Sequence, residues 1–230
     1  MVASLSKSFL EQVKNGLIVS CQAPDGSPFR GRDLMSVMAE AAEAGGADAI
    51  RAEGLSDIKS IKKAVSLPVL GLIKFITTDT PVIITPLIQH VSDLIEAGAD
   101  MIAVDATNRK RADGSIGAEF VARARELGIP ILADIDDVTS AVAAQKAGAD
   151  AISTTVAGYT GGTVPLTPDI DLVAECAKAC TVPVIAEGRY YTPQQVSDAF
   201  KAGAWSVCVG GAITDPYLST KRFVSQMHGN

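Results

Sequence analysis

The chain has 230 residues, 47% of them hydrophobic, a length that suits one large domain and leaves little room for a second. Because the formal net charge is −6 and the pI about 4.9, we expect neither a nucleic-acid partner nor binding to an anionic membrane. The first 17 residues include Lys7, Glu11 and Lys14, so we expect no signal peptide, no membrane span and a cytoplasmic location.

A repeated phrase organises the chain. Gly-Ala-Asp stands at 46–48, 98–100 and 148–150, and Gly-Ala-Trp at 203–205. The copies are 50 to 55 residues apart, which is close to two βα units of roughly 30 residues each. Each copy ends an Ala-rich amphipathic stretch and precedes a short apolar run, and Pro68, Pro130 and Pro183 introduce the apolar runs between copies. This alternation predicts a single (β/α)8 TIM barrel.

The predicted elements follow in chain order. Residues 1–16 are expected to form a helix that closes the bottom of the barrel. Apolar runs predict eight strands at 17–19, 49–51, 69–74, 101–105, 131–134, 151–155, 184–187 and 206–209. Amphipathic stretches predict helices at 33–45, 56–65, 87–97, 117–127, 137–147, 168–179, 193–202 and from about 215 onward. Thr167 and Thr192 each precede a proline, which is typical of an N-cap followed by Pro at the first helical position. No linker divides residues 1–230, so we expect one domain.

The residue that closes each strand marks the candidate active-site rim, because TIM-barrel sites lie at the carboxyl ends of the strands. Ionisable residues are rare at the ends of buried strands unless they serve a purpose there. The rim positions are Gln22, Arg51, Lys74, Asp105, Asp134, Thr155, Glu187 and Gly210.

Lys74 and Glu187 are the candidate proton-transfer pair. Lys74 ends an apolar strand, and partial desolvation beside Arg51 would lower the pKa of its amine enough to make it a base. Glu187 faces the same rim, so the two could exchange protons with a substrate. The alternative is an ion pair that only fills the mouth of the barrel.

Glycines after the last two strands predict a phosphate site. Gly188, Gly210 and Gly211 stand where barrels often bind phosphate through backbone N–H groups and a short helix. They could instead relieve crowding at the rim. Three long strand-to-helix connections, 75–86, 106–116 and 156–167, lie on the same side, and the Gly-rich third one could act as a lid.

Histidine and cysteine patterns argue against a metal or a disulfide framework. The two histidines, His90 in a helix and His228 in the tail, lie away from strand ends, which excludes a His-based metal site or a Ser-His-Asp triad. We read His90 as a surface or packing residue. The four cysteines contain no Cys-x-x-Cys pair and are expected to be reduced.

The ordered motifs resemble the N-acylmannosamine-6-phosphate 2-epimerase family of sialic acid breakdown. The resemblance spans residues 17–224 and is carried by Cys21–Ala23, Gly46–Ala52, Gly71–Lys74, Asp105–Arg109, Ala133–Ile135, Thr154–Thr160, Ala186–Arg189 and Gly210–Thr214. It implies an isomerase that interconverts N-acetylmannosamine 6-phosphate and N-acetylglucosamine 6-phosphate by removing and returning the proton on C2. It further implies no cofactor, no required metal and a homodimer.

The resemblance also implies roles for individual residues. Lys74 matches the family base and Glu187 the acid/base that handles oxygen protons. The matched substrate-binding positions are Gln22, Arg51, Asp134, Thr155, Gly188, Arg189, Gly210 and Gly211.

Two positions depart from the family pattern. Phe75 replaces an Arg after the catalytic lysine, and Asp215 replaces an Arg that binds the phosphate. A carboxylate repels a phosphate, so Arg189 or Arg222 would have to supply the cation, or Asp215 caps the last helix ahead of Pro216.

Two other functions remain open from the residues. A desolvated Lys74 could form a Schiff base in a class I aldolase-like lyase. The barrel could also be a non-catalytic sugar-phosphate sensor, which Asp215 favours and the intact Lys74 and Glu187 oppose.

Overall fold

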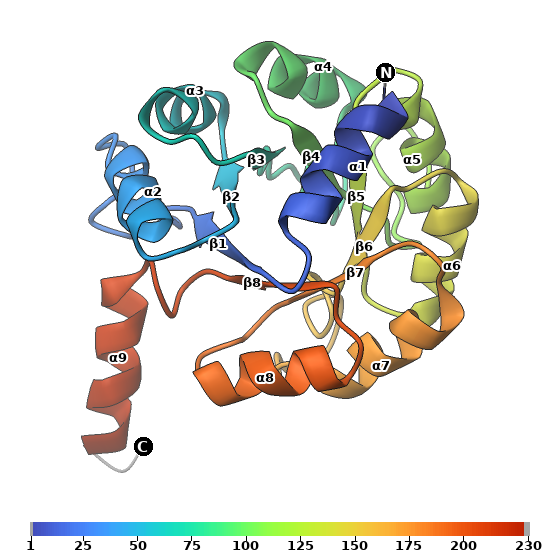
Figure 1. Cartoon of the computed structure of the whole chain (residues 1–230). Coiled ribbons are helices and arrows are strands. Elements are labelled where there is room, and N and C mark those ends of the chain that lie inside the picture. Colours follow the sequence, from blue (N-terminus) through green and yellow to red (C-terminus); the bar gives the residue numbers. More distant parts are fainter. Residues whose placement is uncertain (1, 228–230) are drawn as a thin grey trace.

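The computed structural model describes residues 2–227 and contains a closed barrel of parallel strands in sequence order, as the repeat predicted (Figure 1). The strands are β1 (Leu17–Cys21), β2 (Ala49–Glu53), β3 (Val69–Leu72), β4 (Met101–Asp105), β5 (Ile131–Asp134), β6 (Ala151–Ser153), β7 (Val184–Glu187) and β8 (Ser206–Val209). β8 pairs with β1 and so closes the sheet on itself. The predicted fold class is confirmed.

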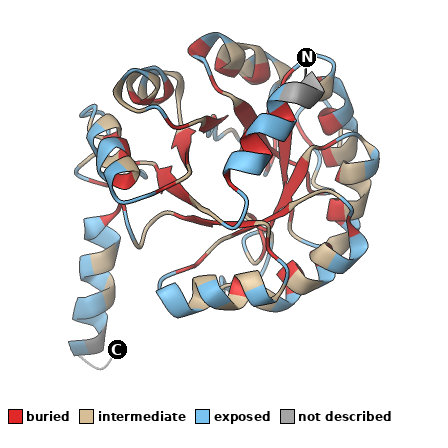
Figure 2. Cartoon of the chain, viewed as in Figure 1, coloured by how far each residue is buried: buried red, intermediate tan, exposed pale blue. Residues whose placement is uncertain are grey.

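Helices surround the barrel, with their buried faces turned towards the strands (Figure 2). They are α1 (Val2–Gln12), α2 (Met35–Ala44), α3 (Leu55–Ala64), α4 (Ile88–Ala97), α5 (Gly117–Arg125), α6 (Val138–Lys146), α7 (Ile170–Ala179), α8 (Pro193–Lys201) and α9 (Pro216–Met227). In Figure 1, α9 extends away from the ring of helices. His228 and the rest of the tail lie outside the described residues. Within residues 2–227, no helix combines the length and the apolar character that crossing a bilayer requires.

The repeated aspartates have one structural task, which explains the repeat. The carboxylates of Asp48, Asp100 and Asp150 accept hydrogen bonds from the first N–H groups of β1, β3 and β5, at 2.8, 2.7 and 2.9 Å. Each aspartate therefore satisfies the first backbone N–H group of the odd-numbered strand that precedes it, which would otherwise lack an acceptor. The glycine that opens each copy takes a positive φ, +92° at Gly46, which favours glycine there.

The fourth copy carries Trp205 in place of aspartate, and it binds the N-terminal helix instead. The indole Nε1 of Trp205 donates to the carbonyl of Leu10 at 2.7 Å. Phe9, Leu10 and Val13 pack against buried side chains at the beginnings of the strands, such as Ile18. α1 therefore covers the end of the barrel opposite the candidate site.

Several predicted element ends differ from the structure by a few residues; β6, for example, ends at Ser153 and not at Thr155. Strand β3 ends at Leu72, and Lys74 lies beyond it in an isolated antiparallel bridge with Ile84, because the 75–86 connection folds back. Helix α7 begins at Ile170 with Asp169 as its N-cap, not at Thr167–Pro168. Thr192 caps α8 as predicted, with its hydroxyl accepting from Gln195 N.

Candidate active site

A cavity of about 440 Å³ opens at the carboxyl ends of the strands. All the site residues predicted from the sequence line it except Asp134, which lies beneath its floor. Pattern reasoning missed several lining residues, because neither side-chain type nor spacing marks them; they include Ser20, Ile84, Tyr159, Tyr191 and Leu218. Among residues 2–227 there is no group of three or more His, Cys, Asp or Glu side chains placed to hold a metal ion.

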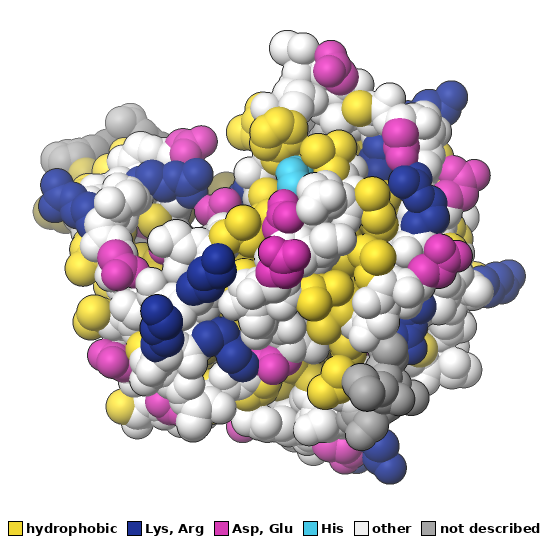
Figure 3. Space-filling model, turned by 90° about the horizontal axis from the view of Figure 1, so that it is seen from above, with side chains coloured by type: hydrophobic (Ala, Val, Ile, Leu, Met, Phe, Trp, Pro, Cys, Tyr) yellow, Lys and Arg dark blue, Asp and Glu magenta, His cyan; other side chains and the backbone are white. Residues whose placement is uncertain are grey.

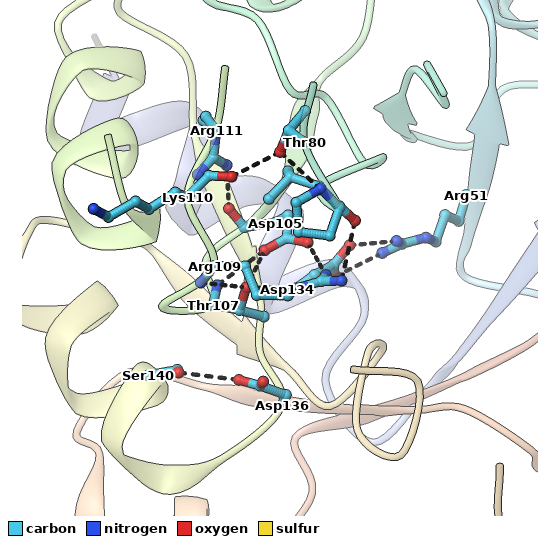
Figure 4. Close-up of polar contacts among 12 residues, drawn as sticks. Arg51, Thr80, Asp105, Thr107, Arg109, Lys110, Arg111, Asp134, Asp136 and Ser140 are labelled. Carbon is cyan, nitrogen blue, oxygen red and sulfur yellow. Dashed lines mark hydrogen bonds and ion pairs between the residues drawn. The ribbon is translucent and has the colours of Figure 1, made fainter. Parts of the chain in front are cut away.

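A buried arginine joins two carboxylates at the cavity floor. Arg51 is 1% exposed and forms a bidentate pair with Asp134, with Nη1–Oδ1 and Nη2–Oδ2 distances of 3.2 and 2.6 Å (Figure 4). Its Nη1 also lies 3.0 Å from Oε2 of Glu187. Burial opposes the charge on Arg51, but the two carboxylates outweigh it and raise its pKa above the ordinary value. Arg51 is therefore a permanent cation held between two carboxyl groups.

The surroundings of Glu187 favour its protonated form. Burial raises the pKa of Glu187, as does the nearby charge of Asp134, against the opposing effect of Arg51. Thr155 Oγ1 lies 2.7 Å from Asp134 Oδ1 and 3.0 Å from Glu187 Oε2. Because Thr155 has one hydroxyl proton, it can donate to only one of these two carboxyl groups at a time.

Lys74 reaches the cavity from the bridge after β3. Its side chain has access to water through the open mouth, although the surrounding wall partly desolvates the amine. This desolvation, together with repulsion from Arg51, lowers the pKa of Lys74 below its usual value of 10.5. Desolvation by the cavity wall at Lys74 and by burial at Glu187 thus shifts the pKa of each group towards its uncharged form.

A buried network outside the cavity fixes the loop that carries Lys74. Asp105 is 0% exposed, and its Oδ2 pairs with Arg109 at 2.5 Å (Figure 4). Arg109 also donates to the carbonyl of Pro81 at 3.1 Å, and Thr80 donates to that of Lys110 at 2.7 Å. Asp105, predicted as a rim residue, therefore ties the 75–86 and 106–116 connections together.

The glycine-rich end of the cavity offers unused backbone donors. In the described part of the chain, the N–H groups of Gly188, Gly210 and Gly211 have no protein acceptor. A Cβ on Gly210 would approach Ser20 Cβ to 3.2 Å, so the backbone is closely packed there. Several free N–H groups facing one end of a cavity suit an anion such as phosphate.

Arg189 is held by a loop, although it also lines the cavity. It is 7% exposed, and its Nε and Nη1 donate to the carbonyls of Thr167 and Ala157 at 2.7 and 2.5 Å. Its guanidinium also lies 5.2 Å from the ring centre of Tyr159. Arg189 therefore fastens the two ends of the 156–167 connection, and these bonds use much of its donor capacity.

Asp215 is an N-cap, which was one of the two roles considered from the sequence. Its Oδ1 accepts a hydrogen bond from Leu218 N at 2.9 Å, and Pro216 occupies the first position of α9. Two turns on, Arg222 lines the cavity with its guanidinium 3.8 Å from the ring centre of Tyr191.

On the face in Figure 3, the basic side chains form no continuous patch, and acidic and hydrophobic side chains lie among them.

His90 is half-buried and has a packing role, with its ring edge against Phe75 at 5.4 Å between centroids.

Comparison with known proteins gives consistent matches. Residues 35–229 match the NanE family, described as "Putative N-acetylmannosamine-6-phosphate epimerase". Two similar proteins, each described as "Putative N-acetylmannosamine-6-phosphate 2-epimerase", come from Caldanaerobacter subterraneus subsp. tengcongensis and Clostridioides difficile. The first is 45% identical over 96% of this chain and 94% of its own, and the second is 43% identical over 96% and 100%. The solved structure of the N-acetylmannosamine-6-phosphate 2-epimerase from Clostridium perfringens has a TM-score of 0.90 at 41% identity, covering 94% of this chain and 95% of that one.

Proposed function

This chain belongs to the N-acetylmannosamine-6-phosphate epimerase family, and from that premise we propose how its own residues invert C2 of the sugar. The chain is an isomerase acting on a small amino-sugar phosphate. Inversion at C2 converts N-acetylmannosamine 6-phosphate into N-acetylglucosamine 6-phosphate. The observation that carries the mechanism is that Lys74 and Glu187 line one cavity, with Arg51 3.0 Å from Glu187. The pKa of Lys74 is shifted down and that of Glu187 up, which agrees with these roles.

The reaction begins with the sugar ring open, because an aldehyde at C1 makes the C2 proton acidic. Neutral Lys74 takes the C2 proton while protonated Glu187 gives its proton to the C1 oxygen. The electron pair of the C–H bond moves into a C1–C2 double bond, and C2 becomes planar. Rotation about the C2–C3 bond then turns the other face of C2 towards Lys74. The Lys74 ammonium returns its proton to that face, the C1 hydroxyl gives its proton back to Glu187, and the epimer forms with both side chains in their starting states.

The protein charges balance during this step. Lys74 becomes an ammonium and Glu187 a carboxylate, so opposite charges develop at one site. Arg51 remains positive throughout and stabilises the new carboxylate across 3.0 Å. Asp134 and Thr155 fix Arg51 and Glu187 in position, which costs no reorganisation at the moment of reaction.

The remaining substrate contacts follow from the ends of the cavity. Gln22 and Arg51 lie where they can bind the sugar and its N-acetyl group, and the free N–H groups of Gly188, Gly210 and Gly211 suit the phosphate. The enzyme needs no cofactor under this proposal. We further propose a single barrel domain that acts as a homodimer in the cytoplasm.

Proton NMR in D₂O tests the mechanism. Solvent deuterium should enter the sugar at C2 only, and added EDTA should leave the rate unchanged. Borohydride should trap no adduct on Lys74, whereas a Schiff-base lyase would give one. Epimerisation without label at C2 would exclude the proton-transfer route.

A further inference from the structure

We propose that Arg222 of α9 supplies the cation for the substrate phosphate in this chain, and that Asp215 contributes by fixing α9. This inference rests on the proposed function, because it concerns the phosphate end of the same cavity. Asp215 lines this cavity, and its carboxylate would repel a phosphate, so the cation that binds the phosphate must come from another residue.

The first step is the position of Arg222. It lines the same cavity as Gly188, Gly210 and Gly211, whose N–H groups have no protein acceptor in the described part of the chain. The cavity is thus lined by unused backbone donors, by the Arg222 guanidinium and by the Lys74/Glu187 pair. Phosphate is bound best by such a combination of N–H groups and a planar cation.

The second step is that Arg222 is available. Its guanidinium stacks on Tyr191 at 3.8 Å from the ring centre, which fixes the plane and leaves the N–H edge free. Within residues 2–227, no carboxylate lies within salt-bridge distance of Arg222.

The other cations that line the cavity are already engaged. Arg51 pairs with two carboxylates, and Arg189 donates to two loop carbonyls. Lys74 carries the proposed proton transfer. Of the two arginines considered from the sequence, Arg189 and Arg222, this division favours Arg222 for the phosphate.

The third step gives Asp215 its role. Its side chain is buried and caps α9 through Leu218 N, which sets the first turn of the helix. Asp215, Leu218 and Arg222 are spaced i, i+3 and i+7, so they share one face of the helix, and all three line the cavity. The cap therefore aims the face that bears Arg222, about 10 Å further along the helix axis.

The test compares phosphorylated and unphosphorylated N-acetylmannosamine. Arg222→Ala should lower the ratio of their kcat/KM values about 10- to 100-fold, as expected for loss of a charge-assisted contact to phosphate. Arg222→Lys should lower this ratio less than Arg222→Ala does, since lysine keeps the charge but lacks the planar fork. Lys221→Ala is the matched control, because Lys221 is the adjacent cation on α9, lies over Tyr217 and does not line the cavity. It should leave the ratio unchanged.

Binding of inorganic phosphate, measured by calorimetry, separates this inference from the proposed function. Phosphate should bind the wild type and the Lys221→Ala variant alike and should bind Arg222→Ala at least tenfold more weakly. A wild type that epimerises neither sugar would refute the function while leaving this measurement decisive for Arg222. Equal phosphate affinity in wild type and Arg222→Ala would overturn the inference.

Two substitutions of Asp215 test the cap. Asparagine is also a good N-cap, so Asp215→Asn should keep α9 in place, remove the repulsion and lower KM for the phosphorylated sugar. Asp215→Ala removes the cap as well, and KM should be higher than in Asp215→Asn. If both variants improved KM equally, Asp215 would not act through α9.

Discussion

Arg51 pairs with both Asp134 and Glu187, and we expect these two carboxyl groups to contribute differently to stability and to catalysis. Asp134 makes two contacts to Arg51, is 0% exposed and does not line the cavity. Glu187 makes one contact at 3.0 Å, and its side chain is 14% exposed. We expect Asp134→Asn to reduce stability most and Glu187→Gln to reduce catalysis most.

The magnitudes follow from what each change leaves behind. Removing one partner of a buried ion pair costs about 3 to 5 kcal/mol. In Asp134→Asn the lower end applies, about 3 kcal/mol, because Glu187 still faces Arg51. For a chain of this length that corresponds to a fall in Tm of about 6 to 12 °C. Glu187→Gln keeps the bidentate pair, so Tm should change by less than about 4 °C, while kcat should fall about 10²- to 10⁴-fold.

Thermal unfolding followed by circular dichroism and steady-state kinetics provide the two measurements. The pH profile gives a third, because losing the charge of Asp134 removes a repulsion that raises the pKa of Glu187. That pKa should fall in Asp134→Asn, so activity that needs protonated Glu187 should be lost at lower pH than in the wild type. If Glu187→Gln lowered Tm as much as Asp134→Asn, the assignment of Asp134 as the principal partner of Arg51 would be wrong.

Three further predictions concern the base, the pH range and the loop. Lys74→Ala should lower kcat by at least 10²-fold with an unchanged circular dichroism spectrum, and retention of more than a tenth of the rate would exclude Lys74 as the base. In the wild type, kcat/KM should fall as pH drops, because Lys74 becomes protonated, and fall again as pH rises, because Glu187 loses its proton; a flat profile would contradict the pair. Arg189→Lys cannot hold both Thr167 and Ala157, so hydrogen exchange in the 156–167 connection should accelerate and KM should rise. Unchanged exchange there would contradict the fastening role.

The barrel could be predicted from the sequence because its repeat performs a local task. Asp48, Asp100 and Asp150 each bind the first N–H of the preceding odd-numbered strand, so the same geometry recurs wherever the phrase recurs. Residues at or just after the strand ends also indicated the cavity, since Lys74 and Glu187 both line it, although Asp105 and Asp134 do not.

Contacts across the barrel could not be predicted in the same way. Arg51 and Asp134 are 83 residues apart, and only the closed sheet reveals that one lies beneath the other. The carbonyls that accept hydrogen bonds from Arg189 belong to a connection more than 20 residues away, and nothing in the local sequence indicates them. These contacts depend on side-chain direction and on acceptors far away in the sequence, and the local spacing of residues predicts neither.

The hydrogen bond between Trp205 and Leu10 also determines when the N-terminal helix can dock on the barrel during translation. The two residues are 195 positions apart, so the nascent N-terminal helix has no strand bundle to cover until nearly the whole polypeptide has left the ribosome. At ordinary elongation rates this wait lasts on the order of 10 to 40 s, during which Phe9 and Val13 are exposed to chaperones. Trp205 is also the sole tryptophan, and it lies at the end of the molecule remote from the substrate. Its intrinsic fluorescence should therefore report the moment the two termini meet and remain insensitive to sugar binding.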